Sequence, residues 1–109
     1  MSLYEKMKVA SQNKDVAGFL DLLHDDYVFV RHQAGVEMTK TEWAPILTTM
    51  MESPDLEIMN ERCIYENNEI LVVHQFMRFP DKTKEAVLIA YSVLDGKIIR
   101  AETGATPLA

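Results

Sequence analysis

Two residues combine a reactive side chain with an apolar neighbourhood. His74 lies inside the segment Leu71-Val-Val-His-Gln-Phe76, where an imidazole acts as a general base only if a partner orients it and a substrate proton lies within reach. A histidine satisfied by a structural partner is the alternative. Arg31 can hold an anion on its guanidinium fork or pair with a glutamate of a neighbouring element. His74 and Arg31 are therefore the candidates for catalysis, and for each the structural alternative stays open.

Residue types and spacing exclude several other chemistries. Glycine occurs only at positions 18, 35, 96 and 104, so the chain has neither a dinucleotide-binding fingerprint nor a phosphate-binding P-loop. The three histidines, at positions 24, 32 and 74, lack the spacing of a helical metal pair, and Cys63 is the only cysteine. A zinc site is not expected from such a set. We expect no cofactor and no metal.

Composition places the chain among ordinary globular domains. The 109 residues suit one domain spanning positions 1–109, with 48% hydrophobic and 26% charged residues. The net charge of −6 argues against a nucleic-acid partner, which requires clustered Lys and Arg. No apolar run is long enough to span a membrane, and the first residues lack the apolar core of a signal peptide. We expect a cytoplasmic protein.

The sequence pattern predicts two helices, a strand, a third helix and then four further strands. The first two helices are expected from Leu3 to Gln12 and from Asp15 to His24. Strands are expected over Tyr27–His32, Leu56–Tyr65, Glu69–Phe79, Glu85–Leu94 and Lys97–Thr103.

The start of the third helix is ambiguous. Thr39 and Glu42 form a capping-box pattern, but that register places Pro45 well inside the helix, where proline is unfavourable. We therefore expect Thr41 to be the cap, with the helix ending at Ser53-Pro54.

The passage from a helix through Asp25-Asp26 into the strand at Tyr27, and the closing turn Asp95-Gly96-Lys97-Ile98, resemble the NTF2-like superfamily, in its SnoaL-like and steroid-isomerase-like small-pocket branch. The resemblance implies an α+β cone, or cystatin-like roll, in which three N-terminal helices pack on a curved, mostly antiparallel sheet. It further implies a cavity for a small apolar or amphipathic acidic molecule, which either only binds the molecule or has isomerase, cyclase or hydratase activity. The alternative is a non-catalytic homodimerisation module whose cavity is filled by its own side chains.

The same resemblance assigns the side chains that face the cavity. The residues expected to line it are Met7, Tyr27, Phe29, Arg31, Trp43, His74, Phe76 and Leu88. The isomerase base and oxyanion positions fall on Arg31, Met7 and Ala90, which can neither take the proton nor donate to the oxyanion. Steroid-type isomerisation is therefore not expected. A shift of one residue would turn His32, Gln75 and Tyr91 inward instead.

An amphipathic acid would place its head on Arg31, because an unpaired buried guanidinium is strongly unfavourable. A protein carboxylate from Glu42, Glu57 or Glu61 is the alternative partner.

The strand from Glu85 to Leu94 is apolar on both faces, whereas a half-exposed antiparallel strand alternates apolar and polar residues. One face of this strand should therefore pack against the core. A second copy of the chain is the simplest partner to cover the opposite face. We assign this homodimer face to Val87, Ile89, Tyr91 and Val93.

Overall fold

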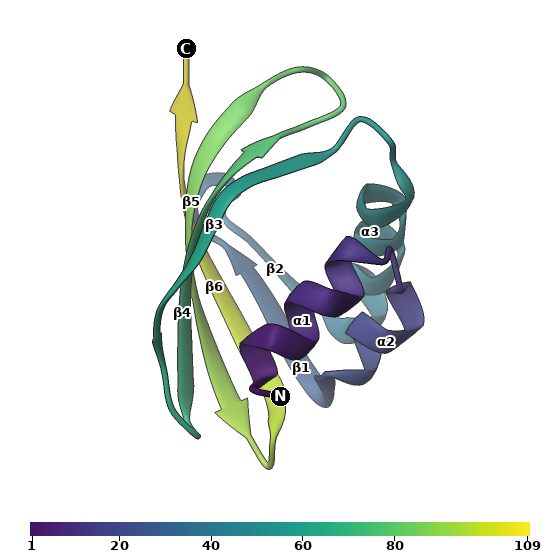
Figure 1. Ribbon diagram of the computed structural model, residues 1–109, viewed down its shortest axis with the longest axis vertical. Helices are drawn as coiled ribbons and strands as arrows, with labels where there is room; N and C mark the ends of the chain where they lie inside the picture. The colour runs from purple at the N-terminus through teal and green to yellow at the C-terminus, as the bar shows by residue number, and fades with distance from the viewer.

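The computed structural model describes residues 1–109 as one layer of helices against the concave face of a curved sheet (Figure 1). The helices are α1 (Leu3–Gln12), α2 (Val16–Asp21) and α3 (Lys40–Glu52), with a short 3-10 turn at His32–Ala34. The strands are β1 (Leu23–Arg31), β2 (Val36–Thr39), β3 (Glu57–Glu66), β4 (Ile70–Arg78), β5 (Lys84–Leu94) and β6 (Lys97–Leu108). This arrangement confirms the predicted α+β architecture.

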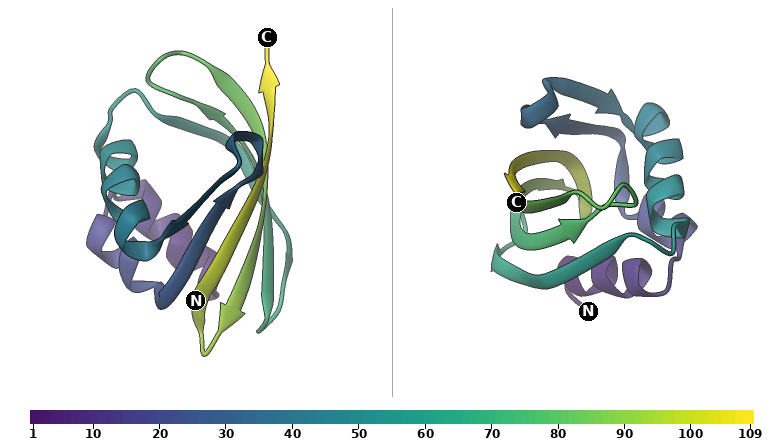
Figure 2. Two further views of the ribbon diagram at one scale, coloured as in Figure 1. Left: turned by 180° about the vertical axis from the view of Figure 1, so that it is seen from behind. Right: turned by 90° about the horizontal axis from the view of Figure 1, so that it is seen from above.

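The six strands form one open sheet in the order β2-β1-β6-β5-β4-β3. All neighbours are antiparallel except β1 and β6, which are parallel. The sheet curves around the helices, as the two further views in Figure 2 show. No helix has both the length and the apolar character needed to cross a membrane.

The first two helices begin where the sequence predicts. Ser2 caps α1 in a reciprocal capping box with Glu5, and the Asp15 side chain accepts from the Gly18 amide at the start of α2. The second helix is shorter than predicted because Leu23 already pairs with Ile98 as the first residue of β1. The strand therefore begins four residues before the predicted Tyr27.

The predicted start of the third helix at Thr41 is wrong. The Thr39 hydroxyl accepts from the Glu42 amide at 3.3 Å, and Glu42 Oε1 accepts from the Thr39 amide at 3.0 Å. This capping box satisfies two amide donors that a free helix end would leave unpaired. The helix retains its regular course through Pro45.

Two parts of the sheet extend beyond the prediction. Strand β2 pairs with β1, with Thr39 opposite Val28 and Val36 opposite Arg31. It was not predicted, because four residues are too few to show the alternation of a strand. Strand β6 continues from the predicted end at Thr103 to Leu108 along β5. Pro107 is tolerated because β1 ends opposite Thr103, so beyond that point β6 needs no amide donor on its free side.

The inward and outward faces of β5 are the reverse of the prediction. Val87 and Ile89 are buried in the core under the helices, and Tyr91 lines the interior. Leu88 points outward and is 48% exposed. The assignment of Val87, Ile89 and Tyr91 to an outer dimer face is therefore wrong. Both sets of side chains are apolar, so the alternation that fixes strand parity is absent.

Candidate functional site: an apolar cavity with buried polar groups

A cavity of about 450 Å³ lies between the helices and the concave face of the sheet. Of the 30 residues that line it, 21 are hydrophobic. Volume and lining are those of small-molecule sites, which are largely apolar with a few placed polar groups.

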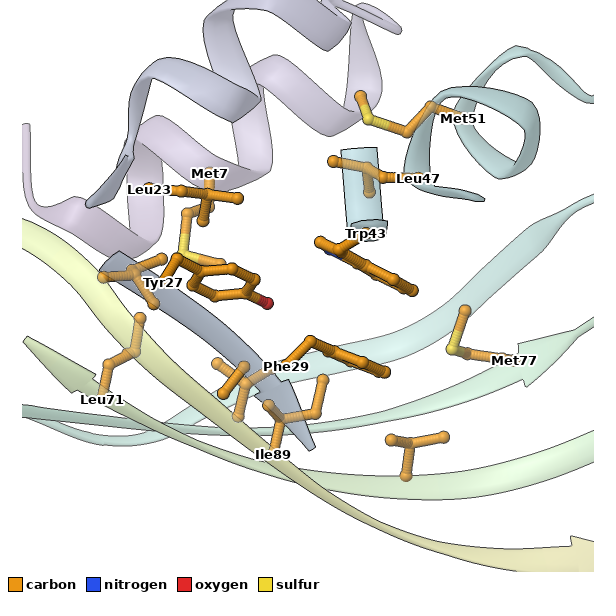
Figure 3. Close-up of a cluster of buried hydrophobic side chains, with 14 residues drawn as sticks. Met7, Leu23, Tyr27, Phe29, Trp43, Leu47, Met51, Leu71, Met77 and Ile89 are labelled. Carbon is orange, nitrogen blue, oxygen red and sulfur yellow. The ribbon is translucent and has the colours of Figure 1, made fainter. Parts of the chain in front are cut away.

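One wall of the cavity is a pair of parallel aromatic rings. Phe29 of β1 and Trp43 of α3 stack with ring centroids 3.9 Å apart and planes 6° apart, as Figure 3 shows. The capping box at Thr39 fixes the start of α3 and so brings Trp43, in the first turns of the helix, over β1. Each ring covers one face of the other, and the stacked pair adds aromatic carbon to the apolar wall.

Three polar side chains that the sheet contributes to the lining make no hydrogen bond with the protein. Tyr27 is only 3% exposed and Gln75 only 7%, yet neither the Tyr27 hydroxyl nor the Gln75 amide has a partner within the chain; the Tyr91 hydroxyl has none either. Each of the three residues lines the cavity, and in Figure 3 the Tyr27 hydroxyl points into the space between β1 and Trp43. Their hydrogen-bonding capacity is directed at the cavity.

Burial keeps Tyr27 and Tyr91 protonated. Desolvation raises the pKa of Tyr27 far above its ordinary value, and the nearby Tyr91 raises it further. Desolvation also raises the pKa of Tyr91, with a second contribution from the negative charge of Glu61. Tyr27 and Tyr91 are therefore neutral hydrogen-bond donors at any physiological pH.

Glu61 is the only carboxylate that lines the cavity. It lies in an irregular stretch of β3 between Met59 and Arg62, where Asn60 has a φ of 53°. Such a bulge redirects side chains, and the Tyr4 hydroxyl donates to Glu61 Oε1 at 3.2 Å. Burial, followed by the charge of Glu61, raises the pKa of Tyr4 to about 12.

Arg31 lines the cavity but is already paired. Its Nη2 donates to both carboxylate oxygens of Glu85, at 2.9 and 3.2 Å, and to Gln33 Oε1 at 3.2 Å. The expected partners Glu42, Glu57 and Glu61 are not used. Because a protein carboxylate neutralises the guanidinium, the expectation that Arg31 holds the head of an acidic ligand is wrong.

The structure brings together five of the eight residues that the sequence assigned to the cavity. These are Met7, Tyr27, Phe29, Arg31 and Trp43. The other three, His74, Phe76 and Leu88, lie on the opposite face of the sheet, where His74 meets the Phe76 ring edge-on at a centroid distance of 5.2 Å. His74 therefore cannot act on a molecule in the cavity.

Three residues of the candidate site were not among the predicted lining residues: Glu61, Gln75 and Tyr91. Gln75 and Tyr91 belong to the alternative register, shifted by one residue. His32, the third member of that alternative, is exposed. The signal for Glu61 was an unusual backbone angle at Asn60, which a sequence does not display. No group of three or more His, Cys, Asp or Glu side chains is placed to hold a metal ion.

No protein-family model and no curated protein matches this chain. Solved structures do. An NTF2-like protein of unknown function from Mesorhizobium loti has a TM-score of 0.82 at 13% identity, covering 95% of this chain and 88% of that one. An NTF-2 like protein of unknown function from Burkholderia xenovorans gives 0.77 at 13%, covering 98% and 82%.

A third similar structure contains a small organic molecule. It is a hypothetical protein with a ketosteroid isomerase-like fold from Catenulispora acidiphila, in complex with trimethylamine. Its TM-score is 0.67 at 9% identity, covering 94% of this chain and 83% of that one. Together these similarities show that the chain has the NTF2-like fold; at such identities they carry no activity across.

Proposed function

We propose that this protein binds a small, mainly apolar molecule in the cavity of its cone, as a member of the SnoaL-like small-pocket group. The carrying observation is an apolar cavity into which Tyr27, Gln75 and Tyr91 direct polar groups that have no partner in the protein. An apolar surface of this kind gains free energy when a ligand covers it. A ligand of uniform apolarity would leave the polar groups unsatisfied, so a polar function on the ligand is part of the proposal.

The composition of the walls favours an accommodating site. Five of the seven methionines line the cavity: Met7, Met38, Met50, Met51 and Met77. Methionine side chains are unbranched and polarisable and adapt to the shape of a ligand. Binding is the function that the geometry supports best, because the lining is mainly apolar and contains no histidine, cysteine or aspartate and only one carboxylate, Glu61.

Trp43 provides a direct test, because it is the only tryptophan and lies in the cavity wall. Titration with naphthalene should shift the single indole N–H resonance in a nitrogen-15 NMR spectrum. Ile89→Phe, which narrows the cavity, should weaken the effect. Leu88→Phe, one position along the same strand but on the outer face, is the matched control and should leave it unchanged. An unmoved Trp43 resonance in the parent protein would contradict the proposal.

A second candidate function is self-association through the outer face of the sheet. The helices all lie on the other face (Figure 1), and Leu88 stands exposed at the centre of the uncovered one, on the strand next to Phe76. We propose that a second copy covers this face, through Leu88 and Phe76 in place of Val87 and Ile89. Sedimentation of the parent at tens of micromolar should show a dimer that Leu88→Lys dissociates; a monomeric parent would contradict it.

A further inference from the structure

The amide of Gln75 identifies the ligand's polar group more narrowly. Gln75 lies on β4 between Val73 and Met77, which also face the cavity, and pairs with the inward-facing Val87 of β5. No hydrogen bond joins its oxygen or its nitrogen to the protein, and both atoms are reached from the open space of the cavity. Building on the proposed binding function, we infer that the ligand is a cyclic amide (a lactam), held by two hydrogen bonds to Gln75.

Both ends of the Gln75 amide require a partner. The side chain offers an acceptor, Oε1, and two donors on Nε2, and a buried polar group left unpaired costs more than a hydrogen bond gains. A ketone satisfies only the donor and leaves Oε1 unpaired. A cyclic amide carries an N–H beside a C=O at the same spacing as the glutamine amide, so the two groups can pair through two parallel hydrogen bonds.

The charges around the cavity disfavour an anionic ligand. Arg31 is compensated by Glu85 at 2.9 Å, and the one lining carboxylate, Glu61, accepts from the neutral Tyr4 hydroxyl. Lys8 and Lys14 also line the cavity, but both are exposed to solvent at its edge. An anion beside Gln75 would therefore be desolvated without a free positively charged partner, which is strongly unfavourable.

The aromatic pair gives the ligand ring an apolar wall to contact. Phe29 and Trp43 both line the cavity, and Figure 3 shows them beside the Tyr27 hydroxyl. The protonated Tyr27 and Tyr91 hydroxyls supply donors for a second acceptor on the ligand.

The test compares three molecules of nearly equal shape: 2-quinolone, 1-methyl-2-quinolone and naphthalene. The first has both the donor and the acceptor, the second has lost the donor, and the third has neither. Binding is followed through the Trp43 indole resonance and quantified by calorimetry. We expect 2-quinolone to bind at least about fivefold more tightly than its methylated form, the factor that one neutral hydrogen bond provides.

The Gln75→Leu variant separates recognition of the lactam by Gln75 from differences in solubility and shape between the two quinolones. It keeps the size of the side chain and removes the amide, so the ratio of the two quinolone affinities should fall to about one. A ratio unchanged from the parent, or no preference in the parent, overturns the lactam inference. Naphthalene then shows which of the two proposals has failed. If naphthalene still shifts the Trp43 indole resonance, the cavity binds apolar molecules and only the inferred class of ligand is wrong. If none of the three shifts Trp43, the proposed function fails as well.

Discussion

The pairing of Arg31 with Glu85 leads to an asymmetric prediction for stability. The Glu85 side chain is 9% exposed and that of Arg31 32%. Arg31→Met leaves a carboxylate buried without its cation, and we expect a loss of about 3 kcal/mol, the lower end of the range for a broken buried pair. Glu85→Gln leaves a guanidinium that is one-third in solvent and keeps Gln33 as an acceptor, so its cost should be nearer 1 kcal/mol.

The double variant separates the pair from its individual members. Arg31→Met combined with Glu85→Met replaces both charges by apolar groups, and such replacements of buried pairs are close to neutral. We therefore expect the double variant to be more stable than Arg31→Met alone.

Urea unfolding monitored by the fluorescence of Trp43 measures these differences. With a slope of about 1–3 kcal/mol/M, a loss of 3 kcal/mol moves the midpoint down by roughly 1–3 M. Single variants that both lie within about 0.5 kcal/mol of the parent would refute the reasoning. So would a Glu85→Gln variant that is less stable than Arg31→Met, since burial would then not determine the cost.

Three further predictions concern other parts of the molecule. Thr39→Ala removes the cap of α3 and should cost about 1 kcal/mol in urea unfolding, with the exposed Thr49→Ala as the control; equal costs would argue against the cap. Tyr4, Tyr27 and Tyr91 have raised pKa values, so the unfolded chain loses protons first and stability should fall as the pH rises above 10; stability that is flat from pH 9 to 11 would contradict this. A β,γ-unsaturated steroid ketone should not be isomerised above the uncatalysed rate, because the position that the resemblance assigns to the isomerase base is Arg31, which cannot take the proton; measurable turnover would contradict this and make Glu61, the only lining carboxylate, the candidate base.

Most of the fold could be predicted from local signals. The apolar period of α1, the Asp15 cap of α2 and the Asp95-Gly96 turn each act over a few residues, and the structure has all three. The capping box at Thr39 was also visible in the sequence, but Pro45 was given too much weight against it. Strand β2 could not be predicted, because it is held by its pairing with β1 rather than by its own four residues.

The site was harder to predict because it depends on strand parity. The parity of β1 was correct, since Tyr27 and Phe29 alternate with less bulky residues and both line the cavity. In β4 the predicted inward residue was His74, yet its neighbour Gln75 is the buried one. Apolar residues flank both, so the helices covering one face of the sheet decide between them. That information lies in the tertiary packing.

The junction between β2 and α3 has a mechanical consequence. Thr39 is the last residue of β2 and also the cap of α3, so no loop residue separates the strand from the helix. Thr39 pairs with Val28, one residue before Phe29, the partner of Trp43. A displacement of α3 large enough to separate the two rings must therefore strain the hairpin of β1 and β2. The pairing of β1 with β2 therefore couples the position of the aromatic wall to the edge of the sheet, and a substitution that weakens this hairpin is expected to loosen the stack of Phe29 and Trp43.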